Sequence, residues 1–532
     1  MMTTHNTPIT MTLQELLPAI PLESNAAQIK VNNLCLDTRQ LAAGAAFIAL
    51  VGTKVDGRNF IAKAIEAGAS AILVEADKNW QSIAWLGKVP VIAIENLAAQ
   101  VSALAAIFFG NPSKKIPVIG ITGTNGKTTC SLLAAQLLAK LQQKSAVIGT
   151  IGYGLLDAQA VAPISQQLGA LQNTGLTTPD PIAMQRILAE LVEQGATAIA
   201  IEASSHSLEQ KRIASVNIRT AIFTNLTQDH LDYHGDLIRY GNAKAQLLNA
   251  PGLQTAILNA DDAWAKSLLA KMPAGVTPLT FSTQGDSVEN PADIYAKNIQ
   301  LNPFGVSATL ITPWGTADIH SPLLGEFNLS NLLAVIAAVA VQGFPLNAVV
   351  AELPELLPAP GRMQQVVVDQ QAQQIQVIVD YAHTPDALEN TLSAIHQHRP
   401  GNIWTVFGCG GDRDKTKRPQ MGTIAERLSD YVIVTNDNPR SEDPSVIAGE
   451  ILRGMNRPSG CLVIADRAQA IDFAVQQAKA GDIVLIAGKG HEDYQIFANQ
   501  TLPFSDTKQA RIALQKRIAK SENDTASQGA SS

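Results

Sequence analysis

Residues 116–139 read IPVIGITGTNGKTTCSLLAAQLLA, and this stretch decides the fold class of the chain. It begins with the apolar run of a buried strand, continues into glycines, and takes up an apolar helical pattern from Ser131. A strand, a glycine-rich loop and a helix in this order are typical of a nucleotide-binding α/β unit. We therefore predict an α/β protein with a P-loop-type ATPase domain at its centre.

The loop carries residue types that bind phosphate. Between a strand and a helix, its backbone N–H groups and the helix N-terminus can face an anion. We expect Lys127 to contact the β- and γ-phosphates of ATP and Thr128 to ligate Mg²⁺. The spacing departs from G-x-x-x-x-G-K-[ST] because position 121 is isoleucine, and the alternative is a glycine turn with a surface lysine. The predicted ATP-binding loop comprises Gly123, Thr124, Asn125, Gly126, Lys127, Thr128 and Thr129.

The sequence on either side of the loop predicts two further domains. At about 150 residues a domain, a chain of 532 residues suggests about three. Residues 1–114 form a small α/β pattern that ends in the linker-like NPSKKIP. The central domain is expected over 115–357, and alternating strand and helix patterns predict a doubly wound, Rossmann-like domain over 358–520. Residues 521–532, SENDTASQGASS, predict a disordered tail.

Composition argues against several classes of protein. A formal charge of -7 and a pI near 5.8 are unlike those of a nucleic-acid binder. The four cysteines form no CxxC pair, which fits a reducing cytoplasm better than a disulfide framework or a zinc module. The polar start MMTTHNTPIT is unlike a secretory signal. The longest apolar run, residues 332–341, is about half the length that spans a bilayer. We expect a cytoplasmic protein without membrane insertion.

Polar side chains follow several predicted strands. Glu202 ends ATAIAIE, where such folds hold a second Mg²⁺ ligand, although a strand-terminal polar residue would look the same. Residues 229–235, DHLDYHG, suggest cation handling or else a polar turn. Residues 380–386, DYAHTPD, also fit a helix start with Thr384 as N-cap. Arg440 in DNPR follows the strand pattern VIVTN, at a sheet edge where ligands bind, unless it is a solvated turn arginine.

Together these segments resemble the Mur ligase family. The resemblance runs from about Leu34 to Asp506 in the family's order, through LDTR, DGRNFI, GTNGKTT, LTTPD, EASSHSLEQKR, TNLTQDHLDYHG, GEFNLSN, GRMQ, DYAHTPDALE, GCGGDRDKTKRP, DNPR and GKGHEDYQ. It implies three domains: one for the UDP end of the substrate, a central ATPase, and a mobile C-terminal domain that brings the amino acid.

The resemblance also implies the site residues. Those for the UDP-muramoyl dipeptide are Thr38, Thr53, Lys54, Val55, Thr177, Thr178, Ser204, Gln210 and Arg212. The match is loosest at Thr53, where relatives often have histidine. The implied Mg²⁺ ligands are Thr128, Glu202, His230 and Lys244. The implied catalytic residues are Lys127, His230 and Lys244.

Lys244 would carry a carbamate, although by sequence alone it is a helix-surface lysine. The nucleotide would also contact Asn328, Arg362 and Asp380. The pocket for diaminopimelate would consist of Arg413, Asp437, Asn438, Pro439, Arg440, Gly488 and Glu492.

The activity that the resemblance implies is ATP-dependent amide ligation in peptidoglycan synthesis. The match is closest to members that add meso-2,6-diaminopimelate to the D-glutamate γ-carboxylate of UDP-N-acetylmuramoyl-L-alanyl-D-glutamate through an acyl phosphate, releasing ADP and phosphate. We expect a monomer with these small-molecule substrates and no nucleic-acid partner. The alternatives are a lysine-adding relative, a folylpolyglutamate synthase and a P-loop ATPase acting as a binding module. DNPR and DHLDYHG speak against the first two, and the third leaves DYAHTPDALE and DNPR unexplained.

Overall fold

The computed structural model describes residues 9–52, 55–141, 143–285, 292–302, 305–369, 372–398, 401–498 and 500–529, with only the backbone of 521–529. The chain divides into two compact units, Met1–Thr280 and Phe281–Ser532. Within the described ranges, no helix has the length and apolar character that a bilayer crossing needs. All four cysteines are free, and only Cys461 is more than slightly exposed.

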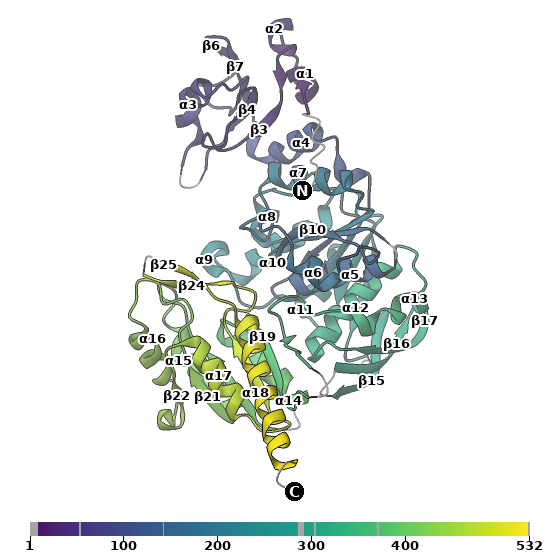
Figure 1. Ribbon diagram of the computed structural model, residues 1–532. Helices are drawn as coiled ribbons and strands as arrows, with labels where there is room; N and C mark the ends of the chain where they lie inside the picture. Colours follow the sequence, from purple (N-terminus) through teal and green to yellow (C-terminus); the bar gives the residue numbers. More distant parts are fainter. Residues whose placement is uncertain are drawn as a thin grey trace. The chain divides into compact units, whose positions relative to one another are not determined.

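The first unit holds two separate sheets (Figure 1). The N-terminal sheet has the order β3-β4-β5-β7-β6 and is parallel except for β6. Its strands are β3 (Asn33–Cys35), β4 (Ala45–Ala49), β5 (Ala71–Glu75), β6 (Ile83–Leu86) and β7 (Val89–Ile94), beside a small pair, β1 (Met11–Thr12) and β2 (Lys30–Val31). This sheet corresponds to the small α/β pattern before the linker.

The second sheet of this unit carries the phosphate loop. It is part of a ten-stranded sheet that continues through β14 to β17; from β10 to β13 the order is β10-β9-β11-β8-β12-β13, and these strands run parallel except β10. They are β8 (Val118–Thr122), β9 (Ser145–Gly149), β10 (Gly152–Leu156), β11 (Ala198–Glu202), β12 (Thr220–Phe223) and β13 (Thr255–Asn259). Because β8 lies between β11 and β12, the loops after these three strands meet at one edge of the sheet. β14 (Thr277–Ser282) crosses the border between the units.

Helices cover these sheets because their apolar faces need burial. They are α1 (Leu13–Leu16), α2 (Ser24–Ala27), α3 (Ile61–Glu66), α4 (Leu97–Phe108), α5 (Lys127–Lys140), α6 (Ile164–Gly169), α7 (Pro181–Glu193), α8 (Ser205–Glu209), α9 (Leu231–His234), α10 (Leu237–Ala245) and α11 (Ala263–Ser267). Helix α7 begins at an N-cap, Asp180, and sends Met184, Ile187 and Leu188 into the core of the central sheet. This packing fixes the sheet edge that carries the loops.

The second unit begins with an antiparallel meander and a buried helix. The meander is β15 (Ile294–Asn302), β16 (Gly305–Thr312) and β17 (Gly315–Ser321). The helices that follow are α12 (Glu326–Ala340) and α13 (Leu346–Ala351). Helix α12 is buried almost all round, as its continuous apolar run predicts.

The rest of this unit is a doubly wound sheet with the order β18-β19-β23-β20-β21-β22. Its strands are β18 (Gln364–Gln365), β19 (Gln376–Asp380), β20 (Ile403–Phe407), β21 (Tyr431–Val434), β22 (Leu462–Val463) and β23 (Ile483–Ala487), followed by a hairpin of β24 (Tyr494–Phe497) and β25 (Gln500–Pro503). Within the six-stranded sheet, all strands except β18 run parallel.

Both faces of this sheet are covered. The helices are α14 (Pro385–His398), α15 (Lys417–Leu428), α16 (Pro444–Leu452), α17 (Arg467–Gln477) and α18 (Asp506–Gly529). One core contains residues of α14, α15 and α16, and a separate core contains residues of α17 and α18. The strands therefore lie between two helical layers, as a parallel sheet requires.

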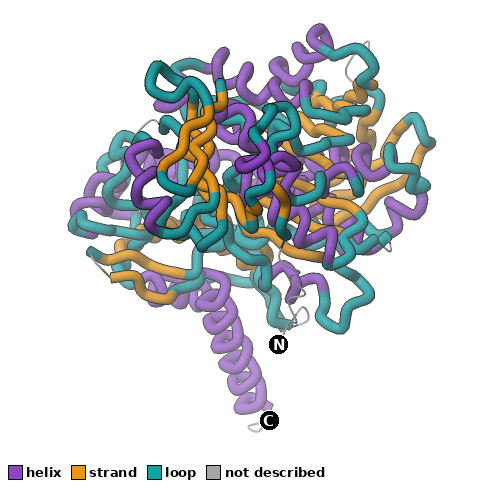
Figure 2. Tube along the Cα trace, turned by 90° about the horizontal axis from the view of Figure 1, so that it is seen from above, coloured by secondary structure: helices purple, strands orange, loops and turns teal. Residues whose placement is uncertain are grey.

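Helix α18 differs from the sequence expectation. It continues to Gly529, where the composition of residues 521–532 predicts a disordered tail, and Figure 2 shows it as one long helix leading to the C-terminus. The helix is anchored at its start, where Ala510, Ala513 and Leu514 are buried. Helix elongation is cooperative once a first turn is fixed. An anchored beginning therefore allows a polar stretch to continue as helix.

A buried ion pair holds the start of α18 to that of α17. Arg467 donates to both carboxylate oxygens of Asp506 at 2.7 Å, and neither side chain is exposed. Its guanidinium also donates to the carbonyl of Ala487 at 2.9 Å. One arginine thus joins two helices to the end of β23.

Replacing Arg467 with methionine is expected to lower the free energy of opening of this region by about 3–5 kcal/mol, because Asp506 becomes an uncompensated buried charge. Native-state hydrogen exchange of the β23 amides measures this quantity. The control is the double variant Arg467→Met with Asp506→Leu, which should recover most of the loss. A single variant that loses under about 1 kcal/mol would contradict the expectation.

Candidate active site

The phosphate loop turns sharply between β8 and α5. Gly123 has φ 148° and Gly126 has φ 88°. A side chain at Gly123 would bring its Cβ to 1.9 Å from Thr224 Oγ1, so only glycine fits there. The loop therefore lies directly against the segment that follows β12.

That segment fixes the loop through Asn225. The amides of Thr124 and Asn125 donate to the backbone oxygen and the Oδ1 of Asn225, at 2.8 and 2.9 Å. Thr224 Oγ1 in turn donates to the carbonyl of Asn125 at 2.6 Å. Two of the loop amides that were expected to face phosphate are thus bonded to Asn225 and stabilise the conformation of the loop. The sequence analysis gave Asn225 no role.

Two lysines meet at the loop. Lys127 Nζ donates to the carbonyls of Gly123 and Thr124, both at 2.8 Å. Lys244 Nζ donates to the same Gly123 carbonyl at 2.7 Å and lies 4.2 Å from the ring centre of Tyr240. Lys244 is 1% exposed, so its interpretation as a helix-surface lysine is wrong. Burial, and then the charge of Lys127, lower the pKa of Lys244 well below its ordinary value.

The other charge beside the loop is the buried carboxylate of Glu202. It accepts from Thr128 Oγ1 at 3.0 Å and from the amide and hydroxyl of Thr150 at 2.8 and 3.0 Å. Burial raises the pKa of Glu202, and the hydrogen bonds and Lys127 offset part of this rise. A direct hydrogen bond thus joins two of the four predicted metal ligands, Thr128 and Glu202.

The oxygens of Thr128 and Glu202 are ligands of the kind that Mg²⁺ prefers, and the buried carboxylate calls for a cation. His230 is about half exposed, and its Nε2 lies 3.4 Å from Asp229 Oδ2. Its ring also packs 6.1 Å from that of Tyr240, on which Lys244 lies. In the described ranges no three His, Cys, Asp or Glu side chains are grouped for a metal ion. The residues fit Mg²⁺ through the threonine and the glutamate, whereas the polar contact of the His230 side chain within the described ranges is with Asp229.

We expect Glu202→Gln to stabilise the metal-free protein while lowering kcat by on the order of 10²-fold or more. A carboxyl whose pKa is raised on folding contributes stability below its unfolded pKa, and this is lost as pH rises through the folded pKa. Glutamine has no such loss. In EDTA, the variant should therefore melt above wild type at pH 7 but not near pH 4.

Differential scanning calorimetry at the two pH values tests this. The matched control is Glu193→Gln, an exposed glutamate on α7, which should show no gain that depends on pH. If Glu202→Gln melts at or below the wild-type temperature at pH 7, the buried charge is not a cost to the fold.

The residues expected to hold the muramoyl dipeptide form one network that reaches Glu202. Thr178 Oγ1 donates to the Glu202 carbonyl at 2.7 Å and lies 3.3 Å from Ser204 Oγ. Arg212 Nη1 donates to the Thr178 carbonyl at 2.9 Å, and Arg212 also donates to Gln210 Oε1. Thr150 Oγ1, which donates to Glu202, can accept from Thr177 Oγ1 at 3.1 Å. All five predicted residues are therefore linked.

The predicted uridine-diphosphate residues lie in the N-terminal sheet. Thr38 follows β3 and Val55 follows β4, and these parallel neighbours end at the same edge. Val55 is exposed. Thr53 and Lys54 lie outside the described residues. Thr38 and Val55 thus stay predictions that the sheet order allows.

The predicted nucleotide residues of the second unit lie on α12 and at the end of β19. Asn328 is buried, and its amide donates to the Leu324 carbonyl at 2.7 Å. Asp380 accepts from the Met363 amide at 2.7 Å, and burial raises its pKa, although Arg362 opposes this rise. Arg362 stacks 4.7 Å from the ring centre of Tyr381. The charge of Arg362 therefore acts on the carboxyl of Asp380.

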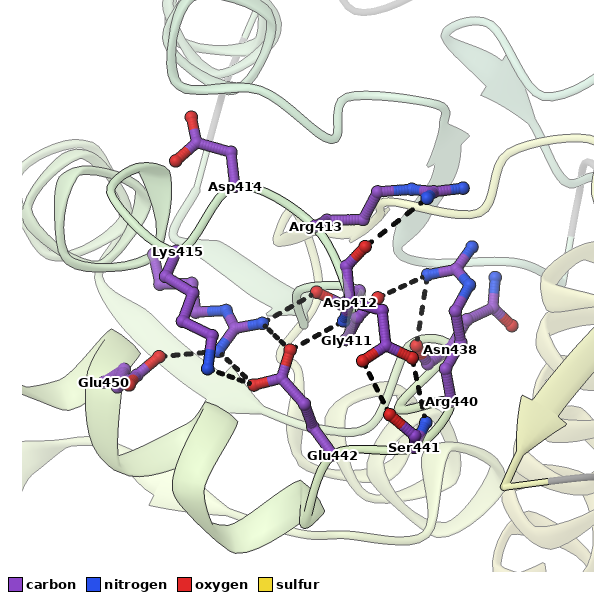
Figure 3. Close-up of polar contacts among 12 residues, drawn as sticks. Gly411, Asp412, Arg413, Asp414, Lys415, Asn438, Arg440, Ser441, Glu442 and Glu450 are labelled. Carbon is purple, nitrogen blue, oxygen red and sulfur yellow. Dashed lines mark hydrogen bonds and ion pairs between the residues drawn. The ribbon is translucent and has the colours of Figure 1, made fainter. Parts of the chain in front are cut away.

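Arg440 and Arg413 lie on two neighbouring loops, after β21 and β20 (Figure 3). Arg440 Nη1 donates to the Gly411 carbonyl at 2.8 Å. A Cβ on Gly410 would lie 2.9 Å from Arg440 Nη1 and 3.7 Å from Arg413 Cγ, so both arginines flank this glycine. Arg440 has φ 53°, in the left-handed region. The expected pair of cations is thus close together.

The other predicted pocket residues surround a buried lysine. Lys489 Nζ donates to Asn438 Oδ1 at 3.0 Å and to Glu492 Oε2 at 2.9 Å. Asn438 Nδ2 donates to the same Glu492 oxygen at 2.9 Å, so its amide is used on both sides within the protein. A Cβ on Gly488 would lie 2.7 Å from Asp437 Oδ2, which brings these two residues together. Pro439 is buried between Asn438 and Arg440.

Sequence reasoning missed Asn225, Thr150, Tyr240 and Lys489. Thr150 and Asn225 each follow a strand next to a loop-bearing strand, so the strand order could have indicated them. Lys489 stands in GKGHEDYQ between the predicted pocket residues Gly488 and Glu492. The sequence pattern does not distinguish a buried lysine at this position from one on the surface. Tyr240 shows no signal, because its contact depends on the packing of α10.

Comparison with known proteins divides the chain into three. The N-terminal part, residues 30–113, matches the model described as Mur ligase family, catalytic domain; residues 121–339 match the Mur ligase middle domain; and residues 361–490 match the Mur ligase, glutamate ligase domain. The predicted three-domain α/β architecture, with a central ATPase and a C-terminal Rossmann-like domain, is confirmed. The middle match crosses residue 280, where the compact units divide.

Similar proteins cover nearly the whole chain. A protein of Coxiella burnetii named UDP-N-acetylmuramoyl-L-alanyl-D-glutamate--2,6-diaminopimelate ligase is 45% identical over 92% of this chain and 96% of its own. One of the same name from Chromobacterium violaceum is 44% identical over 90% and 93%. A solved structure of a ligase of that name has a TM-score of 0.69 at 36% identity, covering 96% of this chain and 99% of its own. By the family models and these identities, the chain belongs to the Mur ligase family.

Proposed function

We propose that the protein adds meso-2,6-diaminopimelate to the D-glutamate γ-carboxylate of UDP-N-acetylmuramoyl-L-alanyl-D-glutamate, with ATP converted to ADP and phosphate. The observation that carries the proposal is the position of Glu202. Its carboxylate contacts Thr128 of the phosphate loop, and its carbonyl contacts Thr178 of the network that would hold the muramoyl dipeptide. A γ-phosphate and an acceptor carboxylate can therefore be brought together beside one residue.

The first step is the activation of the acceptor. A carboxylate does not react with an amine at neutral pH, so one of its oxygens must attack the γ-phosphorus of ATP, forming an acyl phosphate as ADP leaves. Lys127 and the α5 N-terminus would stabilise charge on the transferring phosphoryl group. Bound Mg²⁺, held by Thr128 and Glu202, would supply further neutralisation of phosphate charge. We also assign His230 and Lys244 to the metal site.

Lys244 is suited to carry a carbamate. Its lowered pKa favours the neutral amine, and a neutral amine nitrogen can attack the carbon of CO₂, losing a proton to give a carbamate anion. Such an anion would sit close to Lys127, which also bonds the Gly123 carbonyl. The modification turns a buried base into an oxygen ligand for the metal.

In the second step the amine of diaminopimelate attacks the acyl carbon and phosphate leaves. Arg440 would pair with the distal carboxylate, which lysine lacks, in a two-bond fork. Arg413, Asp437, Asn438, Pro439, Gly488 and Glu492 complete the proposed pocket. Asn438 would act chiefly by holding Glu492, because its side-chain amide already bonds Lys489 and Glu492.

The remaining assignments follow from the same reaction. Asn328, Arg362 and Asp380 would hold the nucleotide, while Thr38, Thr53, Lys54 and Val55 would hold uridine diphosphate. We propose domain borders near residues 114 and 357, closure of the C-terminal domain to exclude water from the acyl phosphate, and a monomer that works in the cytoplasm. Four free cysteines support a reducing compartment.

The test is a direct assay. Purified protein is mixed with ATP, Mg²⁺ and the UDP-linked dipeptide, and either diaminopimelate or lysine is added while phosphate release and product mass are followed. Product formation with diaminopimelate but not with lysine supports the proposal. Product with lysine would keep the ligase reaction and overturn the role of Arg440. Phosphate release without either amino acid would favour an ATPase module.

A further inference from the structure

The two loops that carry Arg413 and Arg440 hold each other through Asp412 and Ser441 (Figure 3). Asp412 Oδ1 accepts from the Ser441 hydroxyl at 2.7 Å, and its Oδ2 accepts from the Ser441 amide at 3.1 Å. In the opposite direction, the Asp412 amide donates to Glu442 Oε1 at 2.6 Å. Each loop therefore supplies a carboxylate to a backbone amide of the other.

Glu442 is itself fixed by a buried guanidinium. Arg418 is not exposed to solvent, and it donates to the two carboxylate oxygens of Glu442 at 2.9 and 3.0 Å. Lys415 adds a third cationic contact at 3.0 Å. These partners hold the pKa of Glu442 well below its ordinary range, so the anion persists at neutral pH. A two-bond fork of this kind fixes orientation as well as charge.

The loops need this restraint because their backbones are strained. Asp412 and Arg440 both have φ 53°, in the left-handed region, which few non-glycine residues adopt and which is unfavourable for a long side chain such as that of Arg440. Such conformations persist only where the surroundings over-determine them. Arg440 shows this directly, since its Nη1 bonds the Gly411 carbonyl on the opposite loop.

We propose that Asp412, Ser441, Glu442 and Arg418 form a clamp that sets the spacing of Arg413 and Arg440 and so determines affinity for the amino-acid substrate. These four are positioning residues, and none is required to touch the substrate. The inference rests on the proposed function, because it takes the two arginines as the diaminopimelate contacts. A shift of about 1 Å in such groups can cost on the order of 10²-fold in rate.

The chain offers a matched pair of variants for the test. Glu442→Gln removes the charge that joins Arg418 to the Asp412 amide. Glu450→Gln removes the other carboxylate on Arg418, which accepts from Nη1 at 2.6 Å and contacts neither loop amide. We expect Glu442→Gln to raise the KM for diaminopimelate about 10-fold or more while the KM for ATP changes less than about twofold. Glu450→Gln should leave both values near wild type.

The outcomes separate this inference from the proposed function. If the wild-type protein shows no turnover that depends on diaminopimelate, the proposed function fails, and the clamp proposal with it. If wild type turns over but Glu442→Gln keeps its KM for diaminopimelate, or both variants raise it equally, only the clamp is overturned.

A gentler pair serves if Glu442→Gln does not fold. Ser441→Ala removes the hydroxyl bond to Asp412, and Ser445→Ala removes a comparable bond to Asp443 at the start of α16. A rise of about threefold in the KM for diaminopimelate with the first alone supports the clamp. Equal values for the two overturn it.

Discussion

Replacing Arg440 with alanine is expected to remove the discrimination between diaminopimelate and lysine, which we place at about 10⁴- to 10⁵-fold in kcat/KM for wild type. A site built around a charged partner rejects an analogue without that partner, because the partly buried guanidinium of Arg440 would be left without an anionic partner. Without Arg440 that penalty disappears. Steady-state kinetics with each amino acid measure the ratio.

Two further variants identify the cause. Arg440→Lys keeps the charge but not the planar fork, and should recover only a minor part of the discrimination. Arg427→Ala, which removes an exposed arginine paired with Glu389, should change neither rate. Should Arg440→Ala retain the wild-type ratio, the distal carboxylate is recognised elsewhere.

Lys244→Ala is expected to lower kcat by on the order of 10³-fold, because it removes the group that we assign as a carbamate beside the phosphate loop. A short carboxylic acid added to the assay should restore part of the activity by replacing the missing anion. Rescue is the informative readout, since damage to the packing around Tyr240 would not respond to a carboxylate.

Lys144→Ala serves as the control, because this lysine lies in the same unit and its Nζ bonds the Gln194 carbonyl, away from the loop. It should keep wild-type activity and show no response to the acid. A Lys244→Ala protein that stays folded and fully active would refute the metal role of the lysine.

Local patterns predicted the parts of the site that depend on neighbours in sequence. The glycines and Lys127 stand within a few residues of one another, between a strand pattern and a helix pattern. Glu202 was uncertain by pattern, and the structure resolves it as a buried partner of Thr128. These positions lie at strand ends, where the order of a parallel sheet already places ligands.

Contacts across long stretches of sequence could not be predicted. Lys244 follows Gly123 by 121 positions, and nothing in its helix distinguishes a side chain packed under a loop from one in water. The helix over residues 521–529 was not predicted for a related reason, since composition does not reveal that Leu514 anchors the start of α18. The division into two compact units at residue 280 also depends on packing, so it could not be located from proline-rich linkers in the sequence.

The left-handed backbone at Arg440 also restricts how this position can change during evolution. Every replacement must adopt a φ near 53°, which glycine, asparagine and aspartate do at low cost and β-branched residues do not. A lineage that alters its amino-acid preference through this position therefore has few single steps that keep the loop folded. We expect the tolerated replacements to be glycine, asparagine and aspartate, so the backbone, and not only the ligand, limits the alternatives that selection can sample.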